Sequence, residues 1–356
     1  MTSFPLDSPY RRLARALDAL PNRFPPAADE SHLRVLEKLF TPEEATLAAE
    51  LRPEIETPAQ IAARLGRSPG ELMALLKGMG RKGLIGMGKT AEGRPGFGLL
   101  PYVVGFYENQ GDRIDADLAQ RFEDYFRGGF ASATNIQPQV HRVIPVGETI
   151  PNTLEIRPYE SASVLVDRMQ AWAVGTCICR KQMALIGKPC GHPIDACMWF
   201  STTPNAFDGN PACHALTREE AHRELRRAAE AGLVHCVSNN QRDTWYICNC
   251  CTCGCGVLRG MAELGLANVV ARSAFVNQVD ETLCAGCEDC LPACQFGALA
   301  VDGVARVNTV RCVGCGVCVI ACPQGALSLA RREGEPEPPA SEAEWNVLRM
   351  QARGMN

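Results

Sequence analysis

Apolar residues in the first hundred positions recur at helical spacing. Leu13, Leu17 and Leu20 share one side of a predicted helix, which prolines end soon afterwards. Further short apolar stripes follow up to about residue 80. Three of these stripes are preceded by an N-capping residue and a proline, which together mark the start of a helix, at Thr41, Thr57 and Ser68. The pattern predicts a set of short helices joined by tight turns.

A glycine-rich hairpin at 86–98 follows these helices. Helix, short turn, helix and hairpin is the order of a winged helix-turn-helix, and the segment resembles the winged-helix domains of small bacterial transcriptional regulators. The helix that would enter the major groove, 68–80, carries Glu71 and Lys77 but no Arg, Asn or Gln to read bases. Basic residues nearby would contact phosphates without reading sequence. We therefore expect a docking or dimerising module rather than a specific DNA reader.

The middle of the chain mixes helical and extended patterns. Helices are predicted at 115–128, 161–174 and 217–231, and the segment 138–158 reads as extended. A strand is expected to begin just after Gly232. Together these elements predict an α+β scaffold.

Length and composition set the broad class. The 356 residues are 46% hydrophobic with a net charge of -4, which fits a globular protein of two or three domains and gives no whole-chain argument for nucleic-acid binding. We see no signal peptide and no apolar run long enough for a membrane span. The 19 cysteines stand at metal-ligand spacings, so we expect a reducing compartment, the cytoplasm, rather than a disulfide framework.

A doubled cysteine motif dominates the C-terminal third. In each copy, three cysteines stand three positions apart and a fourth follows four positions later, which is the spacing that wraps a cubane iron–sulfur cluster. In this arrangement the fourth cysteine of each run ligates the other cluster. We therefore predict two neighbouring [4Fe–4S] clusters, one bound by Cys284, Cys287, Cys290 and Cys322, the other by Cys312, Cys315, Cys318 and Cys294.

The residues between the ligands fit this interpretation. Gly286, Gly314 and Gly316 lie in the ligand loops, where the backbone must crowd the sulfurs and φ is expected to be positive. The segment from about 277 to 330 closely resembles the bacterial 2[4Fe–4S] ferredoxins, although Gln295 stands where that family usually has proline. The alternative of two zinc sites has little support, because the spacing is not that of a zinc ribbon.

The middle domain carries a second concentration of cysteines, and we expect at least one further metal site there. Neighbouring residues of a strand point to opposite faces, so Cys250 and Cys251 are not expected to share a metal. Cys251, Cys253 and Cys255 would share one face, and Cys248 and Cys250 the other. The candidate ligands are Cys177, Cys179, Cys190, Cys197, Cys250, Cys251, Cys253 and Cys255. Iron–sulfur is favoured, with zinc at one site as the alternative.

Other polar residues near these cysteines have less certain roles. The histidines His192, His214 and His235 are expected to be structural, although histidine can replace cysteine at a cluster. Arg180 is a candidate to hydrogen-bond cluster sulfurs.

The sequence predicts a multidomain α+β protein. Its parts are an N-terminal arm, a winged helix-turn-helix, a Cys-rich middle domain, a 2[4Fe–4S] ferredoxin domain, and a linker with a C-terminal helix, at 1–30, 31–105, 106–272, 273–330 and 331–356. We expect an electron carrier, or a subunit of an oxidoreductase, that relays single electrons to a redox partner protein. The alternatives are a redox-sensing DNA-binding regulator and an oxidoreductase with an open-site cluster in the middle domain. No nucleotide-binding fingerprint is present.

Overall fold

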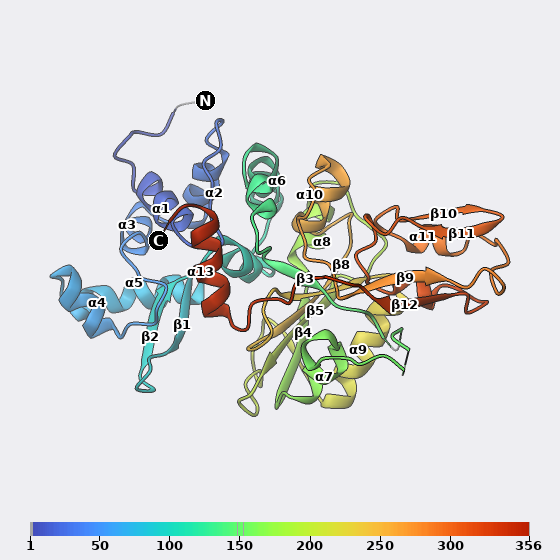
Figure 1. Cartoon of the computed structure of the whole chain (residues 1–356). Helices are drawn as coiled ribbons and strands as arrows, with labels where there is room; N and C mark the ends of the chain where they lie inside the picture. The colour runs from blue at the N-terminus through green and yellow to red at the C-terminus, as the bar shows by residue number, and fades with distance from the viewer. Residues whose placement is uncertain (1–2, 148, 152, 356) are drawn as a thin grey trace. The chain divides into compact units, whose positions relative to one another are not determined.

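The structure is a computed structural model that describes residues 3–147, 149–151 and 153–355 (Figure 1). The chain forms two compact units. The first runs to Ala133 and also includes Gln182–Lys188, and the second contains the remaining described residues from Thr134 onward.

The first unit is mostly helical. Its helices are α1 (Pro9–Asp18), α2 (Ser31–Leu39), α3 (Pro42–Ala48), α4 (Pro58–Leu65), α5 (Pro69–Arg81) and α6 (Ala116–Gly128), with short turns η1 (Tyr102–Phe106) and η2 (Glu108–Gln110). A two-stranded antiparallel hairpin, β1 (Ile85–Lys89) and β2 (Pro95–Leu99), follows α5. The helices and hairpin predicted from 31 to 98 are therefore confirmed as elements.

Local sequence explains where these helices begin. The Thr41 and Thr57 hydroxyls each accept a hydrogen bond from the N3 backbone N–H. In return, the backbone N–H of each threonine donates to the N3 side chain, Glu44 or Gln60, which completes two capping boxes. Ser68 precedes α5 without a side-chain capping bond. The segment predicted as an N-terminal arm is packed: α1 lies against α2 and α3, and Leu13 is fully buried.

A cluster of aromatic side chains joins α6 to the rest of the first unit. Tyr125 of α6 packs against Phe24 and Tyr102, with ring centroids 4.7 and 5.5 Å away, and its hydroxyl donates to the Pro25 carbonyl. Aromatic pairs of this kind attach α6 to the segment between α1 and α2 and to η1. The first compact unit therefore includes α6 and continues to Ala133, with Gln182–Lys188 added from later in the chain.

The second unit is built around a six-stranded antiparallel sheet with strand order β3-β7-β8-β5-β4-β6. The strands are β3 (His141–Val143), β4 (Ala171–Thr176), β5 (Asp195–Ser201), β6 (His214–Leu216), β7 (Val234–Ser238) and β8 (Tyr246–Cys250). One face is covered by α7 (Ala162–Asp167) and α9 (Arg218–Glu230), and an apolar core lies between (Figure 1). The opposite face carries the cysteines described below.

The helix predicted over 161–174 is only partly correct. The helix α7 ends at Asp167, and the chain re-enters the sheet as β4. There β4 pairs with both β5 and β6, so sheet pairing overrides the helical pattern of the sequence. The predicted helix α9, with its Thr217 capping box, and strand β7 are confirmed.

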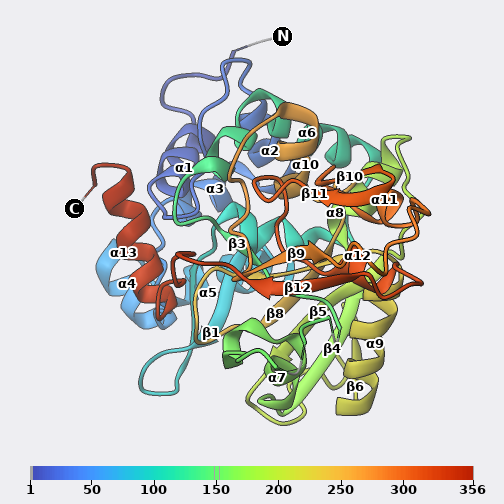
Figure 2. The ribbon, with the colours of Figure 1, turned by 45° about the vertical axis from the view of Figure 1, so that its right-hand side comes forward.

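The ferredoxin-like region is a pseudo-symmetric pair of short elements in the second unit (Figure 2). It contains β9 (Phe275–Val279), α11 (Cys290–Ala293), β10 (Leu299–Asp302), β11 (Val304–Val307), α12 (Val317–Ile320) and β12 (Leu327–Arg331). Strand β9 pairs with β12, and β10 pairs with β11 through a turn at Gly303, which has positive φ. The remaining elements are η3 (Phe130–Asn135), η4 (Pro158–Glu160), α8 (Ile178–Leu185), α10 (Gly256–Leu264) and α13 (Glu342–Ala352).

The C-terminal helix α13 is attached to the second unit by hydrogen bonds to backbone carbonyls. The Trp345 indole N–H donates to Gln139, and the Arg349 guanidinium donates to Ile136 and Pro138 at 2.7 Å each. Among the described residues, no helix combines the length and the apolar character that a membrane crossing requires.

Candidate metal centres

The eight cysteines of the doubled motif line two cavities. Cavity I is lined by Cys284, Cys287, Cys290 and Cys322. Cavity II is lined by Cys294, Cys312, Cys315 and Cys318. Each cavity therefore combines three cysteines of one run with the fourth of the other, the arrangement in which the fourth ligand crosses between two cubane clusters.

The two cavities share apolar packing. Cys290 and Cys322 of cavity I pack with Cys318 of cavity II around Ala305 and Leu327. This contact places the two sets of ligands side by side, which suits electron passage between two clusters.

Hydrogen-bond donors point at ligand sulfurs in both cavities. The Ala305 N–H donates to Cys284 Sγ and the Ala298 N–H to Cys294 Sγ, each at 3.3 Å. The Asn277 amide donates to Cys318 Sγ at 2.9 Å. Such donors stabilise sulfur in its charged, metal-bound form and raise the reduction potential of a bound cluster.

Burial argues that cavity II is a metal site rather than a set of free thiols. Desolvation raises the pKa of Cys315 to about 12 and raises that of Cys318 further. A buried thiol becomes a thiolate at neutral pH only when a cation compensates for its charge. Two such thiols in a cavity that two further cysteines line fit a bound cluster.

Glycine is required where the ligand loops meet neighbouring backbone. Gly286, Gly314 and Gly316 all have positive φ, as predicted. A Cβ on Gly286 would lie 2.4 Å from the Gly303 carbonyl oxygen, and one on Gly314 would lie 2.0 Å from the Phe275 carbonyl oxygen. Only glycine, which has no Cβ, allows the ligand loops to come this close to the neighbouring backbone.

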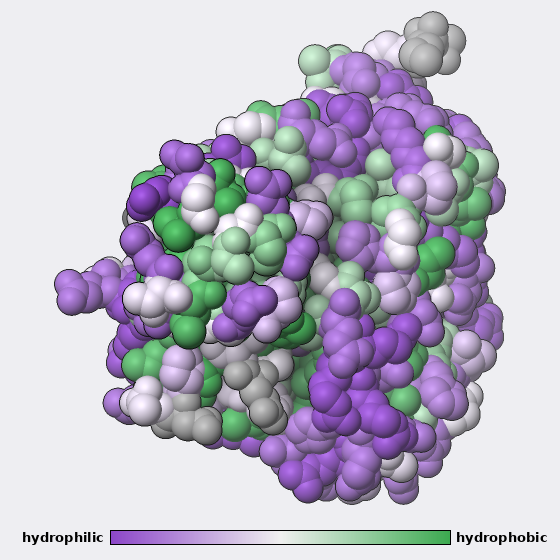
Figure 3. All heavy atoms as spheres, turned by 90° about the vertical axis from the view of Figure 1, so that its right-hand side faces the viewer, coloured by the Kyte–Doolittle hydropathy of each residue, from purple (hydrophilic) through white to green (hydrophobic). Residues whose placement is uncertain are grey.

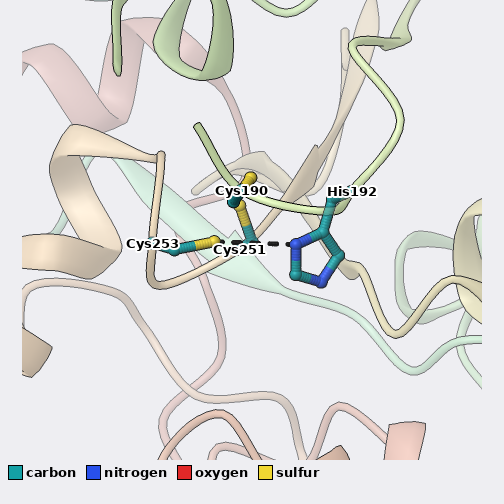
Figure 4. Close-up of side chains that lie close together, drawn as sticks. All are labelled: Cys190, His192, Cys251 and Cys253. Carbon is teal, nitrogen blue, oxygen red and sulfur yellow. Dashed lines mark hydrogen bonds between the residues drawn. The ribbon is translucent and has the colours of Figure 1, made fainter. Parts of the chain in front are cut away.

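A separate group in the middle domain combines three thiols and an imidazole. The ligand atoms of Cys190, His192, Cys251 and Cys253 all lie within 4.8 Å of one another (Figure 4). The Cys253 sulfur is 3.6 Å from His192 Nδ1. This Cys3His group fits the tetrahedral coordination of a single metal ion, and His192, expected to be structural, stands among the candidate ligands.

The other middle-domain cysteines gather on one face of the six-stranded sheet. Cys197 of β5, Cys248 of β8 and Cys236 of β7 are direct cross-strand partners, so their side chains point to the same face. Cys250 lies two residues beyond Cys248 and shares that face. His141 on β3 opposes Ser238 and so faces the same side.

Hydrogen bonds between thiols join these cysteines into one network. The hydrogen bonds form a closed ring that passes from Cys179 to Cys177, Cys197, Cys248, Cys250 and Cys255 and returns to Cys179. One further hydrogen bond joins Cys250 to Cys236. We call this set the seven-thiol group. Its members are Cys177, Cys179, Cys197, Cys236, Cys248, Cys250 and Cys255.

Two members of the seven-thiol group are favoured as thiolates. Hydrogen bonds from Cys177 and Cys248 lower the pKa of Cys197 to about 6. Those from Cys236, Cys248 and Cys255 hold the pKa of Cys250 well below its usual range. The pKa values of four other members, Cys177, Cys236, Cys248 and Cys255, are raised, so these thiols stay neutral beside the two favoured thiolates.

The last four middle-domain cysteines divide between the two groups. Cys251 lies in the Cys3His group and Cys250 in the seven-thiol group, and the expectation that they do not share a metal stays a prediction. However, Cys251, Cys253 and Cys255 do not share a strand face, because β8 ends at Cys250 and the chain turns. The Cys255 N–H closes this turn on the Cys251 carbonyl, and Cys255 rejoins the seven-thiol group.

Arg180 lies between the two middle-domain groups. Its guanidinium donates to the Asn249 carbonyl at 2.9 Å and reaches Cys251 Sγ of the Cys3His group at 3.7 Å. Although burial opposes it, the nearby Cys177 and Cys251 sulfurs raise the pKa of Arg180. The residue is placed to offset thiolate charge in both groups.

The remaining candidate residues lie outside both groups. His235 is on the opposite sheet face, where it pairs with the Asn249 side chain at 2.6 Å. Burial lowers the pKa of His235 to about 4, so its ring is neutral at physiological pH. His214 is exposed on β6.

Sequence reasoning omitted Cys236 and Cys248 from the candidate ligands. The alternation of Cys248 and Cys250 was a usable signal, because residues two apart on a strand share a face.

Gln295, the departure from the ferredoxin pattern, connects the two cysteine-rich regions. Its side-chain oxygen accepts a hydrogen bond from the Thr252 N–H at 2.7 Å, and its amide donates to the Gly232 carbonyl. Thr252 stands between two members of the Cys3His group, and Gln295 follows a ligand of cavity II directly. Proline at this position would lack both bonds.

Comparison with known proteins identifies the C-terminal part of the second unit. No curated protein and no solved structure matches the chain. Residues 283–327 match the 4Fe-4S dicluster domain family, so this segment is an iron–sulfur domain of the class that carries two cubane clusters.

Proposed function

We propose that the protein relays single electrons between a redox partner and its middle domain. The observation that carries this proposal is the packing of two four-cysteine cavities beside further buried thiols. Cubane clusters supply one-electron redox chemistry. Cys284, Cys287, Cys290 and Cys322 would hold the first cluster, and Cys312, Cys315, Cys318 and Cys294 the second.

The exposure of the ligands indicates which of the two cavities a partner protein would approach. Cys287 of cavity I is exposed, whereas Cys315 of cavity II packs into a core that also contains Cys236, Cys250 and Cys255. A partner protein would therefore exchange electrons at cavity I. In each transfer the donor loses one electron and the acceptor gains one, and no bond is made or broken.

The surface around the ferredoxin-like region offers apolar contact for such a partner. Figure 3 faces the end of the second unit that carries β10 and β11, and it shows apolar patches between hydrophilic areas. Leu283, beside the first ligand, is 51% exposed, and Ile320 of α12 is 43% exposed. We propose that these residues contribute to partner docking.

The first unit would serve as a docking or dimerising module of the winged-helix type. The side chains that α5 exposes along its length include Glu71, Ala74 and Lys77, which give little direct readout of bases. A regulator function is therefore the less supported candidate. Any DNA binding should be weak and should fall steeply with salt. A footprint at one defined site that survives about 0.2 M salt would promote the regulator.

The test of the relay is rapid mixing of the anaerobically reduced full-length protein with a one-electron acceptor protein. We expect reoxidation of the clusters in single-electron steps. Replacing Cys284 and Cys287 with serine should abolish fast transfer, whereas replacing Cys213, which lies outside all four groups, should not. Equal rates in both variants would contradict transfer through cavity I.

A further inference from the structure

The seven-thiol group contains more thiols than one ordinary metal site uses. A tetrahedral metal ion takes four ligands, and a cubane cluster also takes four cysteines. All seven sulfurs here belong to one hydrogen-bonded network, so no subset of four stands apart from the rest. Packing alone does not explain such a group, because a buried cysteine that only fills space behaves as a small apolar residue.

Several buried polar side-chain atoms beside the group lack hydrogen-bond partners in the described part of the chain. His141 is 4% exposed, lies near Cys250 and Cys179, and neither of its ring nitrogens has a hydrogen-bond partner among the described residues. Arg180 is 2% exposed, and its Nε and Nη2 atoms also lack partners in the described part of the chain. Buried polar groups without partners are costly, so their presence points to an unseen ligand that accepts hydrogen bonds.

The position of the group favours a redox-active ligand. Cys236 interacts electrostatically with Cys315 of cavity II. The apolar core around Val313 and Val317 contacts cysteines of both sites. The seven-thiol group is thus the direct neighbour of a ferredoxin cluster site, and sulfide ions of an iron–sulfur cluster are acceptors that His141 and Arg180 would satisfy.

We propose that the seven-thiol group binds a polynuclear iron–sulfur centre that uses more than four of its thiolates, with Cys236 and Cys248 among the ligands. The choice of iron rests on the proposed electron-transfer function, whereas the ligand count does not. The Cys3His group is a separate site on the other side of Arg180. The middle domain would then hold two metal sites of different kinds.

The test begins with the unaltered full-length protein, purified without oxygen. Two ferredoxin clusters account for about eight iron atoms per chain. We expect iron clearly above that number, and acid-labile sulfide in similar excess. Iron of eight or fewer, with zinc making up the difference, would overturn the iron–sulfur assignment. This measurement needs no substitution, so it decides even if variants fail to fold.

Seven single Cys→Ser variants then count the ligands by Mössbauer and EPR spectroscopy. More than four of them should alter the signal of the middle-domain centre, C236S and C248S included, while the signal of the ferredoxin clusters remains. The matched control, C213S, should change neither signal. If three or more of the seven variants leave the centre unchanged, or if C236S and C248S are both silent, the proposal is wrong. Failure of the proposed relay would instead appear as missing ferredoxin iron, with the middle-domain result unaffected.

Discussion

Replacing Gly314 with alanine should destabilise the ferredoxin-like region far more than replacing Gly325, although both glycines have positive φ. Gly314 lies between two ligands of cavity II. A Cβ there would lie 2.0 Å from the Phe275 carbonyl oxygen and 2.2 Å from Ser273 Oγ. A Cβ on Gly325 would meet no atom within 4 Å. The pair therefore separates the cost of the clash from the cost of the backbone conformation.

The neighbours of Gly314 have little freedom to move away. The Phe275 carbonyl accepts a hydrogen bond from Arg332 at 2.9 Å, and the Ser273 hydroxyl donates to the Gly314 carbonyl at 2.7 Å. A left-handed conformation costs a residue with a Cβ about 1–2 kcal/mol. Overpacking adds about 1–3 kcal/mol. We expect G325A to lose only the first amount and G314A to lose both.

The assay is the rate at which the thiolate-to-iron absorption band disappears in denaturant, measured without oxygen. Rates are appropriate because proteins with bound clusters rarely unfold reversibly. If the clash is relieved on unfolding, the extra 1–3 kcal/mol makes G314A lose its clusters roughly 5 to 150 times faster than G325A. Rates within about twofold of each other would show that the loop relaxes, and would refute the argument from close approach.

Three further substitutions test individual contacts. Cys322→Ser should damage the cluster of cavity I, seen by EPR; damage confined to cavity II would show that the ligands do not cross. Gln295→Ala leaves the Thr252 N–H without its partner, which costs about 1–3 kcal/mol. A chelator should therefore remove metal from the Cys3His group roughly 5 to 150 times faster. An unchanged rate would refute the role of that bond. Asn277→Ala removes a donor to a cavity II sulfur and should lower the reduction potential of that cluster alone, whereas the exposed control Gln278→Ala should leave both potentials unchanged.

The ferredoxin-like region could be predicted in detail because its ligands are encoded locally. Three cysteines of one loop supply most of each site, and the fourth comes from the other copy of a repeat that the sequence itself displays. The glycines with positive φ and the hairpin at Gly303 follow from similarly local rules. The helix starts at Thr41 and Thr57 were readable for the same reason.

The seven-thiol group could not be predicted in this way, because the register of three strands creates it. Cys197, Cys248 and Cys236 become neighbours only when β5, β8 and β7 pair in that order. The sequence alone does not specify strand order. The turn after Cys250, which sends neighbouring cysteines to different groups, was likewise invisible to a rule based on strand alternation.

Gln295 shows how a departure from a motif can reflect tertiary structure. At the sequence level it only weakened the resemblance to the ferredoxin pattern. In the fold its side chain joins the segment after Cys294 to the backbone at Thr252 and Gly232. Such a contact between distant segments becomes visible only once the fold brings them together.

The most direct test of the account is EPR of the full-length protein, purified and reduced without oxygen, combined with iron and sulfide counts. We predict at least about eight iron atoms per chain and the signals of two interacting reduced [4Fe–4S] clusters. Zinc bound by the eight cysteines of cavities I and II, with little iron and no signal on reduction, would contradict the central claim that this protein carries electrons.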